Sequence, residues 1–268
     1  MTARFAERIV CLTEETTETL YALGEDWRIV GISGFTVRPP QARKEKPRVS
    51  AFTSAKIDRI LALQPDLVLG FSDLQADIAA ELVRHGVAVH VFNQRSVAEI
   101  LTMIRMLGGM LGEQQKTSDY VAELERGIEN ARAESCNAAH RPRVYFEEWD
   151  EPNISAIRWV SELIAIAGGV DCFPELALEP LGKDRIVQNP AEIAHRQPDI
   201  IIGSWCGKKF RPQLVAARPG WQKIPAVVHS EIHEIKSALI LQPGPAALTD
   251  GLAELQRIIG TWRERRRP

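Results

Sequence analysis

The chain has 268 residues, which is enough for two domains of about 100 to 130 residues each. Hydrophobic residues make up 45% of it and charged residues 25%, and no segment has the composition of a disordered tract. Lysine and arginine total 33 against 35 aspartate and glutamate residues, so no net positive charge attracts nucleic acid or an anionic membrane. We therefore expect a soluble globular monomer that neither binds nucleic acid nor inserts into a membrane.

The start of the chain lacks the pattern of an export signal. Its first residues are polar and charged, and the apolar run Ile9–Leu12 is shorter than the hydrophobic region of such a signal. The cysteines Cys11, Cys136, Cys172 and Cys206 lie far apart and show none of the close pairing of zinc or redox motifs. These features predict a cytoplasmic protein, or a periplasmic one if a leader precedes this sequence.

The first third of the chain alternates strand and helix patterns. Arg8–Cys11 predicts a strand, and the helix that follows it ends at Gly24. Leu63–Gly70 contains the motif Gln-Pro-Asp, three apolar residues and glycine, directly after an amphipathic helix. Val87–Phe92 is a further apolar strand. Residues 1–95 are therefore predicted to form an α/β lobe with a parallel sheet.

A helical region follows this lobe. Ser96–Glu99 has the sequence of a capping box, which marks a helix start. Gly108 and Gly109 are expected to interrupt that helix, and a second one of roughly 30 Å is predicted over Glu113–Glu134. Residues 96–139 thus form a connecting segment, whose long helix would permit only modest motion between lobes.

The second half repeats the pattern of the first. Arg143–Phe146 predicts its first strand, and a helix ending at Gly168 follows. Arg196–Gly203 repeats the Gln-Pro-Asp motif with its apolar residues and glycine, and Ala226–His229 is predicted as another strand. Residues 140–268 therefore form a second lobe. The predicted fold is α/β, with two Rossmann-like lobes, parallel sheets, a long connecting helix and a ligand cleft between the lobes.

This organisation resembles class III (cluster A) substrate-binding proteins of ABC importers, which bind vitamin B12, haem and siderophores. The residues that carry the resemblance are Ile9–Gly24, Arg28–Ser33 with Pro39 and Pro40, Ile57–Gly70 and Pro243–Pro245. Within the family the chain is most similar to the cobalamin-binding branch, because Phe35 precedes the Pro-Pro pair. The resemblance implies non-enzymatic binding of a corrinoid ligand, no required cofactor, and an ABC permease as a partner.

By this resemblance a corrin ring would lie flat in the cleft, against loops at the carboxyl ends of the strands. The candidate ligand-binding residues of the first lobe are Thr13, Glu15, Ser33, Phe35, Arg38, Phe52 and Phe71. Thr13 and Ser54 are explained at least as well as helix caps. Three phenylalanines on three polar loops favour ligand contact over core packing.

The candidate residues of the second lobe come from two unusual loops. Glu147–Glu151 places four carboxylates around one tryptophan, and Ser204–Phe210 contains a tryptophan, a cysteine and two lysines. The candidates are Glu148, Trp149, Asp150, Trp205, Cys206 and Lys208. The tryptophans would stack on the ligand, while the carboxylates would accept hydrogen bonds from its amides or pair with Lys208. A solvated acidic turn beside a lysine explains the pattern equally well.

Other functions remain open on the sequence alone. Cys206 with Glu148, Asp150 and a histidine would offer metal ligands for a metal-assisted hydrolase. The six histidines lack metal-binding spacing, however, so we assign no metal or catalytic residue. Binding of a siderophore, haem or another metal chelate would need basic cleft residues, and Arg38, Arg185 and Lys208 are too few to decide.

Permease docking is the point at which the sequence departs from the resemblance. Importer-coupled members carry an exposed glutamate on each lobe, at positions that correspond here to Ala76 and Leu241. Asp77 could substitute in the first lobe, but no carboxylate replaces Leu241. Together with the missing export signal, this favours a cytoplasmic binder that does not serve a permease.

Overall fold

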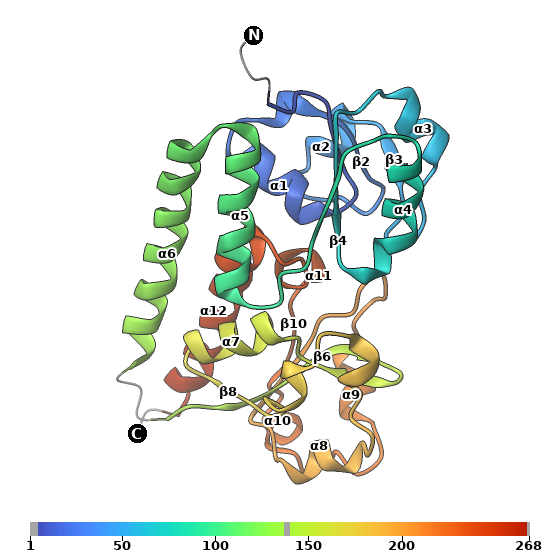
Figure 1. The fold of residues 1–268 in the computed structure, drawn as a ribbon. Coiled ribbons are helices and arrows are strands. Elements are labelled where there is room, and N and C mark those ends of the chain that lie inside the picture. Colours follow the sequence, from blue (N-terminus) through green and yellow to red (C-terminus); the bar gives the residue numbers. More distant parts are fainter. Residues whose placement is uncertain (1–4, 137–139, 267–268) are drawn as a thin grey trace. The chain divides into compact units, whose positions relative to one another are not determined.

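The computed structural model describes residues 5–136 and 140–266. The chain divides into two compact units, each built around its own β-sheet (Figure 1). The N-terminal unit runs to Gln94 and includes Ala98–Glu123, and the C-terminal unit contains Arg95–Val97 and the chain from Leu124 onward. The prediction of two α/β units and a long helix is confirmed.

The sheet of the N-terminal unit is wholly parallel and has the strand order β3-β2-β1-β4-β5. Its strands are β1 (Ile9–Cys11), β2 (Ile29–Ser33), β3 (Arg48–Ser50), β4 (Leu67–Phe71) and β5 (Val89–Phe92). The helices between them are α1 (Glu14–Ala22), η1 (Asp26–Arg28), α2 (Ala42–Glu45), α3 (Ile57–Ala62), η2 (Asp73–Gln75) and α4 (Ala76–Arg84). Strands β1 and β4 are buried throughout, as expected of a parallel sheet.

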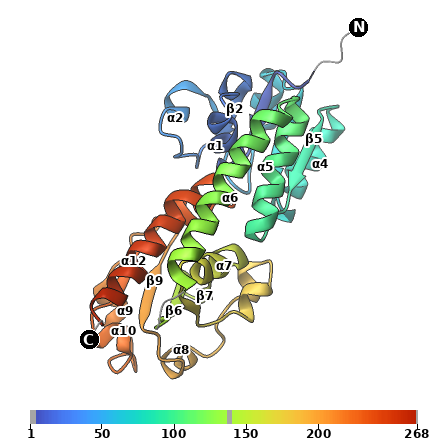
Figure 2. The same ribbon diagram turned by 90° about the vertical axis from the view of Figure 1, so that its left-hand side faces the viewer.

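Two long helices, α5 (Val97–Leu111) and α6 (Gln114–Cys136), follow β5 and lie side by side (Figure 2). The predicted interruption at Gly108 and Gly109 is wrong, because α5 continues through both glycines. A methyl group on Gly108 would collide with the side chain of Thr117, so the glycine allows α5 and α6 to approach closely.

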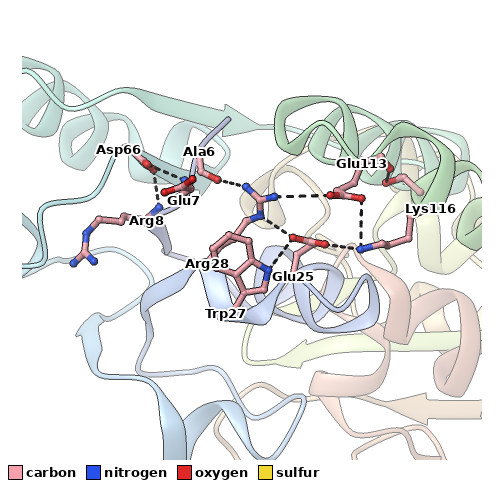
Figure 3. Close-up of polar contacts among 10 residues, drawn as sticks. Ala6, Glu7, Arg8, Glu25, Trp27, Arg28, Asp66, Glu113 and Lys116 are labelled. Atoms are coloured by element: carbon pink, nitrogen blue, oxygen red, sulfur yellow. Dashed lines mark hydrogen bonds and ion pairs between the residues drawn. The ribbon is translucent and has the colours of Figure 1, made fainter. Parts of the chain in front are cut away.

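A network of charged groups around a buried carboxylate fastens the start of α6 to the rest of the N-terminal unit (Figure 3). Glu25 lies at its centre and is only 4% exposed. Its carboxylate accepts hydrogen bonds from Arg28 at 2.7 Å and from Lys116 at 2.5 Å. These partners lower the pKa of Glu25 despite its burial, and Glu113 completes the network 3.9 Å from Arg28.

The sheet of the C-terminal unit has the order β10-β9-β6-β7, with β8 also paired to β6. Its strands are β6 (Arg143–Asp150), β7 (Asn153–Ser155), β8 (Val170–Asp171), β9 (Ile200–Gly203) and β10 (Ile232–Glu234). The helices are α7 (Arg158–Ile166), η3 (Leu176–Leu178), η4 (Gly182–Asp184), α8 (Ala191–His195), α9 (Pro212–Ala216), α10 (Pro225–Val228), α11 (Ser237–Ile240), a π-helix (Ala247–Gly251) and α12 (Leu252–Glu264). The β6–β7 pair is antiparallel, so this sheet is mixed.

Two local predictions in this unit are wrong. Residues 226–228 belong to α10, which His229 caps, rather than to a strand, because Pro225 occupies the first turn of a helix, where its fixed φ is favourable. The predicted acidic loop from Glu147 onward is instead the end of β6, which turns at Glu151 and Pro152 into β7.

The repeated Gln-Pro-Asp motif has the same structural role in both units. Gln64 and Gln197 have φ angles of 47° and 48°, a left-handed conformation that ends the preceding helix. The carboxylate of Asp66 accepts hydrogen bonds from the backbone N–H of Arg8, and that of Asp199 accepts one from Arg143, both at 2.9 Å. Each motif therefore closes a helix and caps the first strand of its sheet.

Among residues 5–136 and 140–266, no helix combines the length and the apolar character that crossing a membrane requires.

Candidate functional site

The loop after β1 contains two buried carboxyl groups. Thr13 holds the N-cap position of α1, but its hydroxyl donates to Glu15 Oε1 at 2.6 Å instead of capping the helix. Burial raises the pKa of Glu15 to about 7 and that of Glu14 to about 8. Glu14 Oε2 accepts the N–H of Val37, whereas its Oε1 is buried without a partner among the described residues. At neutral pH this loop offers a neutral carboxyl group rather than an acidic patch.

The loop after β2 places an aromatic ring in solvent. Ser33 is buried, and its hydroxyl accepts the N–H of Phe35 at 3.2 Å, which fixes the turn. The Phe35 side chain is 61% exposed and can contact a ligand. Arg38 Nε lies 3.0 Å from Glu18 Oε1 and is therefore neutralised by a residue of α1.

The other two phenylalanines differ in exposure. Phe52 is partly buried on the loop after β3, and Phe71 is a buried residue at the end of β4. The backbone of both is held by Gln75, a buried side chain that no sequence motif marks. Its amide donates to the Phe52 carbonyl at 2.9 Å and to the Leu12 carbonyl at 3.4 Å, while its oxygen accepts the Phe71 N–H at 2.9 Å. Gln75 thus joins three strand-end loops.

In the C-terminal unit the carboxylate of Glu147 is fully buried and saturated with donors. Arg218 binds both of its oxygens, at 2.6 and 2.9 Å, and Trp205 Nε1 donates to it at 3.2 Å. Tyr145 and Asn153 each donate to Oε2 at 3.0 Å. Glu147 belongs to the predicted acidic loop, whereas Arg218 and Tyr145 were not among the predicted site residues. The network orients Trp205, which was predicted.

Glu148 has a separate partner. Both of its oxygens are bound by Arg185, at 2.6 and 3.1 Å, and Arg185 also donates to the Ser155 carbonyl. The Arg185 side chain is almost completely buried, so its charge depends on Glu148. Neither residue is available as a free cation or anion for a ligand.

Lys208 brings the remaining predicted residues together. Its ammonium group pairs with Asp150 Oδ2 at 2.5 Å and lies 5.7 Å from the ring centre of Trp149 and 5.2 Å from that of Trp205. These distances fit cation–π contacts. Trp149 is partly exposed, whereas Trp205 is largely buried against Phe210, so Trp149 offers more of its ring to a ligand.

Beside this cluster is a hollow of about 400 Å³. The residues around it include Asp150, Trp205, Lys208, Lys209, Arg211 and Arg218. Lys208 and Arg218 are neutralised by the carboxylates described above, while Lys209 and Arg211 have no ion-pair partner in the described part of the chain. The carboxylate of Glu151 also lines the hollow, which therefore combines a tryptophan with basic and acidic side chains.

The residues considered as metal ligands do not come together in the structure. Cys206 is exposed, while Glu148 and Asp150 are each engaged by a basic residue. Across residues 5–136 and 140–266, no three histidine, cysteine, aspartate or glutamate side chains are grouped so that they could hold a metal ion.

The positions predicted to dock onto a permease lie at helix ends. Ala76 and Asp77 begin α4 and are exposed, and Leu241 caps the end of α11.

The sequence matches the model of the family described as periplasmic binding protein over residues 9–239. An uncharacterized ABC transporter substrate-binding lipoprotein of Bacillus subtilis is 24% identical, over 94% of this chain and 80% of the relative. A vitamin B12-binding protein of Vibrio campbellii is also 24% identical, over 97% of this chain and 92% of the relative.

Solved structures share the fold. A possible iron-binding, periplasmic solute-binding protein of Staphylococcus epidermidis has a TM-score of 0.82 at 21% identity, covering 96% of this chain and 99% of that protein. The periplasmic haem-binding protein RhuT of Roseiflexus has a TM-score of 0.78 at 25% identity, covering 95% and 99%.

These findings contradict the predicted cytoplasmic location. The matching family is one of periplasmic binding proteins, and a relative that covers nearly the whole chain is a substrate-binding lipoprotein of an ABC transporter. The prediction rested on the composition of a few residues at the start of the sequence. The family assignment rests on more than 200 residues that form both units.

Proposed function

The chain belongs to the periplasmic binding protein family, and on this premise we propose that it binds a corrinoid related to vitamin B12 without catalysing a reaction on it. The observation that carries the proposal is the similarity to the vitamin B12-binding protein of Vibrio campbellii, which extends over 97% of this chain. Proteins of this family are substrate-binding proteins, and binding requires no catalytic group.

The strand-end residues support a flat, amide-bearing ligand. The exposed ring of Phe35 and the partly exposed ring of Trp149 offer apolar faces, which suit the edge and face of a macrocycle. The protonated Glu14 and the polar rim of the hollow at Lys208 offer partners for amide groups.

We further propose that the loaded protein delivers its ligand to an ABC permease. The similarity to the Bacillus subtilis substrate-binding lipoprotein of an ABC transporter supports this partner. Asp77 is exposed at the first turn of α4 and is the carboxylate that we assign to docking in the N-terminal unit. Leu241 supplies no charge, so docking of the C-terminal unit has to use another residue.

Haem, or another iron chelate, is the second candidate ligand. The similarity to the haem-binding protein of Roseiflexus supports it, as do the two unpaired cations of the hollow. Lys209 and Arg211 would bind the carboxylates of haem through charge-assisted hydrogen bonds. A direct titration distinguishes the two candidate ligands.

The test is calorimetric titration of the purified protein with cyanocobalamin, cobinamide and haemin. We expect saturable binding of a corrinoid, and at least a tenfold weaker affinity, about 1.4 kcal/mol, for Trp149→Ala. Trp27→Ala is the control, because Trp27 is exposed on η1, before β2 and thus far from the strand ends. Binding of haemin alone would select the second candidate, and binding of none of the three would refute both.

A further inference from the structure

The N-terminal unit contains a second hollow that the proposed function does not use. Its volume is about 420 Å³, and it opens at the carboxyl ends of β2 and β3. The residues around it include Gly34, Arg48, Ser50, Ser54, Lys56 and Arg59. It is therefore lined by residues of an edge strand, of the loop that follows it and of α3.

The charged side chains that line this hollow are all positive. Arg48, Lys56 and Arg59 line it, and no carboxylate does. None of these three side chains makes a hydrogen bond or an ion pair within the described residues. Asp58 lies between two of them in sequence, yet it forms no ion pair with either and does not line the hollow. Three cations around one space repel one another, and an anion that enters this space would be attracted to all three.

The frame that holds these cations is well defined. Arg48 and Ser50 are two residues apart on β3, so their side chains point to the same face of the sheet. The following loop is closed by two backbone hydrogen bonds, from Ala51 N to Ser54 O at 2.7 Å and from Lys56 N to Val49 O at 3.0 Å. The backbone between Arg48 and Lys56 is therefore well ordered by hydrogen bonds.

Ser50 supplies a second, independent observation. Its hydroxyl oxygen is buried and has no hydrogen-bond partner among residues 5–136 and 140–266. A buried polar atom without a partner costs about 1–3 kcal/mol, so a hydrogen-bonding partner for this hydroxyl would be favourable. Ser50 is one of the residues that line the hollow, together with the three cations.

We propose that this hollow binds an oxyanion of the phosphate type, held by Arg48, Lys56 and Arg59 with a hydrogen bond from the Ser50 hydroxyl. Guanidinium groups bind phosphate oxygens in pairs through their planar fork, and the ammonium group adds a point charge. The anion is either inorganic or a phosphate group within a larger ligand. The site goes beyond the proposed function, because it does not depend on a macrocycle.

The first test uses inorganic phosphate as the probe, with chloride replacing it at constant ionic strength. Broadening of the ³¹P resonance should give a dissociation constant on the order of 1 mM for the wild-type protein. The triple variant R48Q/K56Q/R59Q should weaken binding at least tenfold. Because the three side chains are exposed and unpaired, it should fold normally.

The matched control is R43Q/K44Q/K223Q, which removes the same charge from exposed cations that do not line the hollow. It should bind phosphate like the wild type. The proposal is overturned if the wild-type protein does not broaden the resonance, or if both triple variants weaken phosphate binding equally, because the effect would then come from net charge alone.

A second experiment distinguishes inorganic phosphate from a phosphate group within a larger ligand. Cyanocobalamin carries a phosphodiester that cobinamide lacks, so R48Q/K56Q/R59Q should weaken only cyanocobalamin if the hollow receives a phosphate of the ligand. Unchanged affinity for both corrinoids, with inorganic phosphate binding lost, would support an independent anion site. If neither corrinoid binds the wild type, the proposed function fails while the phosphate measurement still tests this site.

Discussion

Arg218 holds the fully buried carboxylate of Glu147 through two parallel hydrogen bonds of 2.6 and 2.9 Å. Glu147 lies in β6, whereas Arg218 comes from the segment after α9. The pair therefore joins two segments that are 71 residues apart in sequence. The same carboxylate accepts the indole N–H of Trp205, so the pair also orients one wall of the candidate ligand hollow.

The first prediction concerns this pair. Arg218→Met should lower the free energy of unfolding by about 3–5 kcal/mol, because it leaves a buried carboxylate without its counter-charge. Urea denaturation measures the change. The control is Arg257→Met, which removes an exposed pair with Glu254 and should cost less than about 1 kcal/mol. Equal losses in the two variants would contradict a structural role for the buried pair.

Local patterns were sufficient to predict the repeated motif and the fold. The sequence Gln-Pro-Asp contains a residue in the left-handed conformation, a proline and a carboxylate that caps a neighbouring strand, and each of these depends on nearby residues or on strand order. The same holds for the helix ends at Gly24 and Gly168, which have positive φ angles.

Ion pairs between residues that are distant in the chain could not be predicted from the sequence. Nothing in the order of residues indicates that Glu147 pairs with Arg218 or Glu148 with Arg185, and these pairs turn a predicted acidic loop into a neutralised strand end. For the same reason Trp205, predicted to stack on a ligand, is a buried core residue. Whether Phe35, Trp149 and Lys208 contact a ligand stays a prediction.

The second prediction separates two adjacent glycines of α5. Gly108→Ala should destabilise the protein by about 1–3 kcal/mol, because its methyl group would collide with Thr117 of α6. Gly109→Ala should instead stabilise it by up to about 1 kcal/mol, because Gly109 faces open space and alanine favours a helix. Thermal denaturation of the two variants is the measurement. Stabilisation by both would show that α5 and α6 do not pack closely at Gly108.

The third prediction concerns the dependence of stability on pH. Burial raises the pKa of Glu14 to about 8 in the folded protein, from about 4.5 in the unfolded chain. Between these values the folded state binds more protons than the unfolded state, so the contribution of Glu14 to stability is complete below pH 4.5 and is lost as the pH rises through 8.

Glu14→Gln should remove part of this dependence. At pH 8.5 the variant should be more stable than the wild type by roughly 2 kcal/mol, and near pH 5 the difference should be small. Urea unfolding at both values measures it. Asp73→Asn, which alters an exposed carboxylate, is the control and should leave the difference between the two pH values unchanged. A Glu14→Gln variant with the wild-type pH profile would show that Glu14 ionises normally in the folded protein.

The last prediction concerns Gln75, which joins the loops of the N-terminal unit. Gln75→Met preserves the length of the side chain but removes its hydrogen bonds to Phe52 and Phe71, so it should destabilise the protein by about 1–3 kcal/mol. Hydrogen exchange at the Phe71 amide should accelerate, because this amide loses its acceptor. Gln41→Met, at an exposed position before α2, should change neither quantity. If Phe71 exchange is unchanged in Gln75→Met, another group accepts this amide, and Gln75 does not fix the loop that carries Phe52.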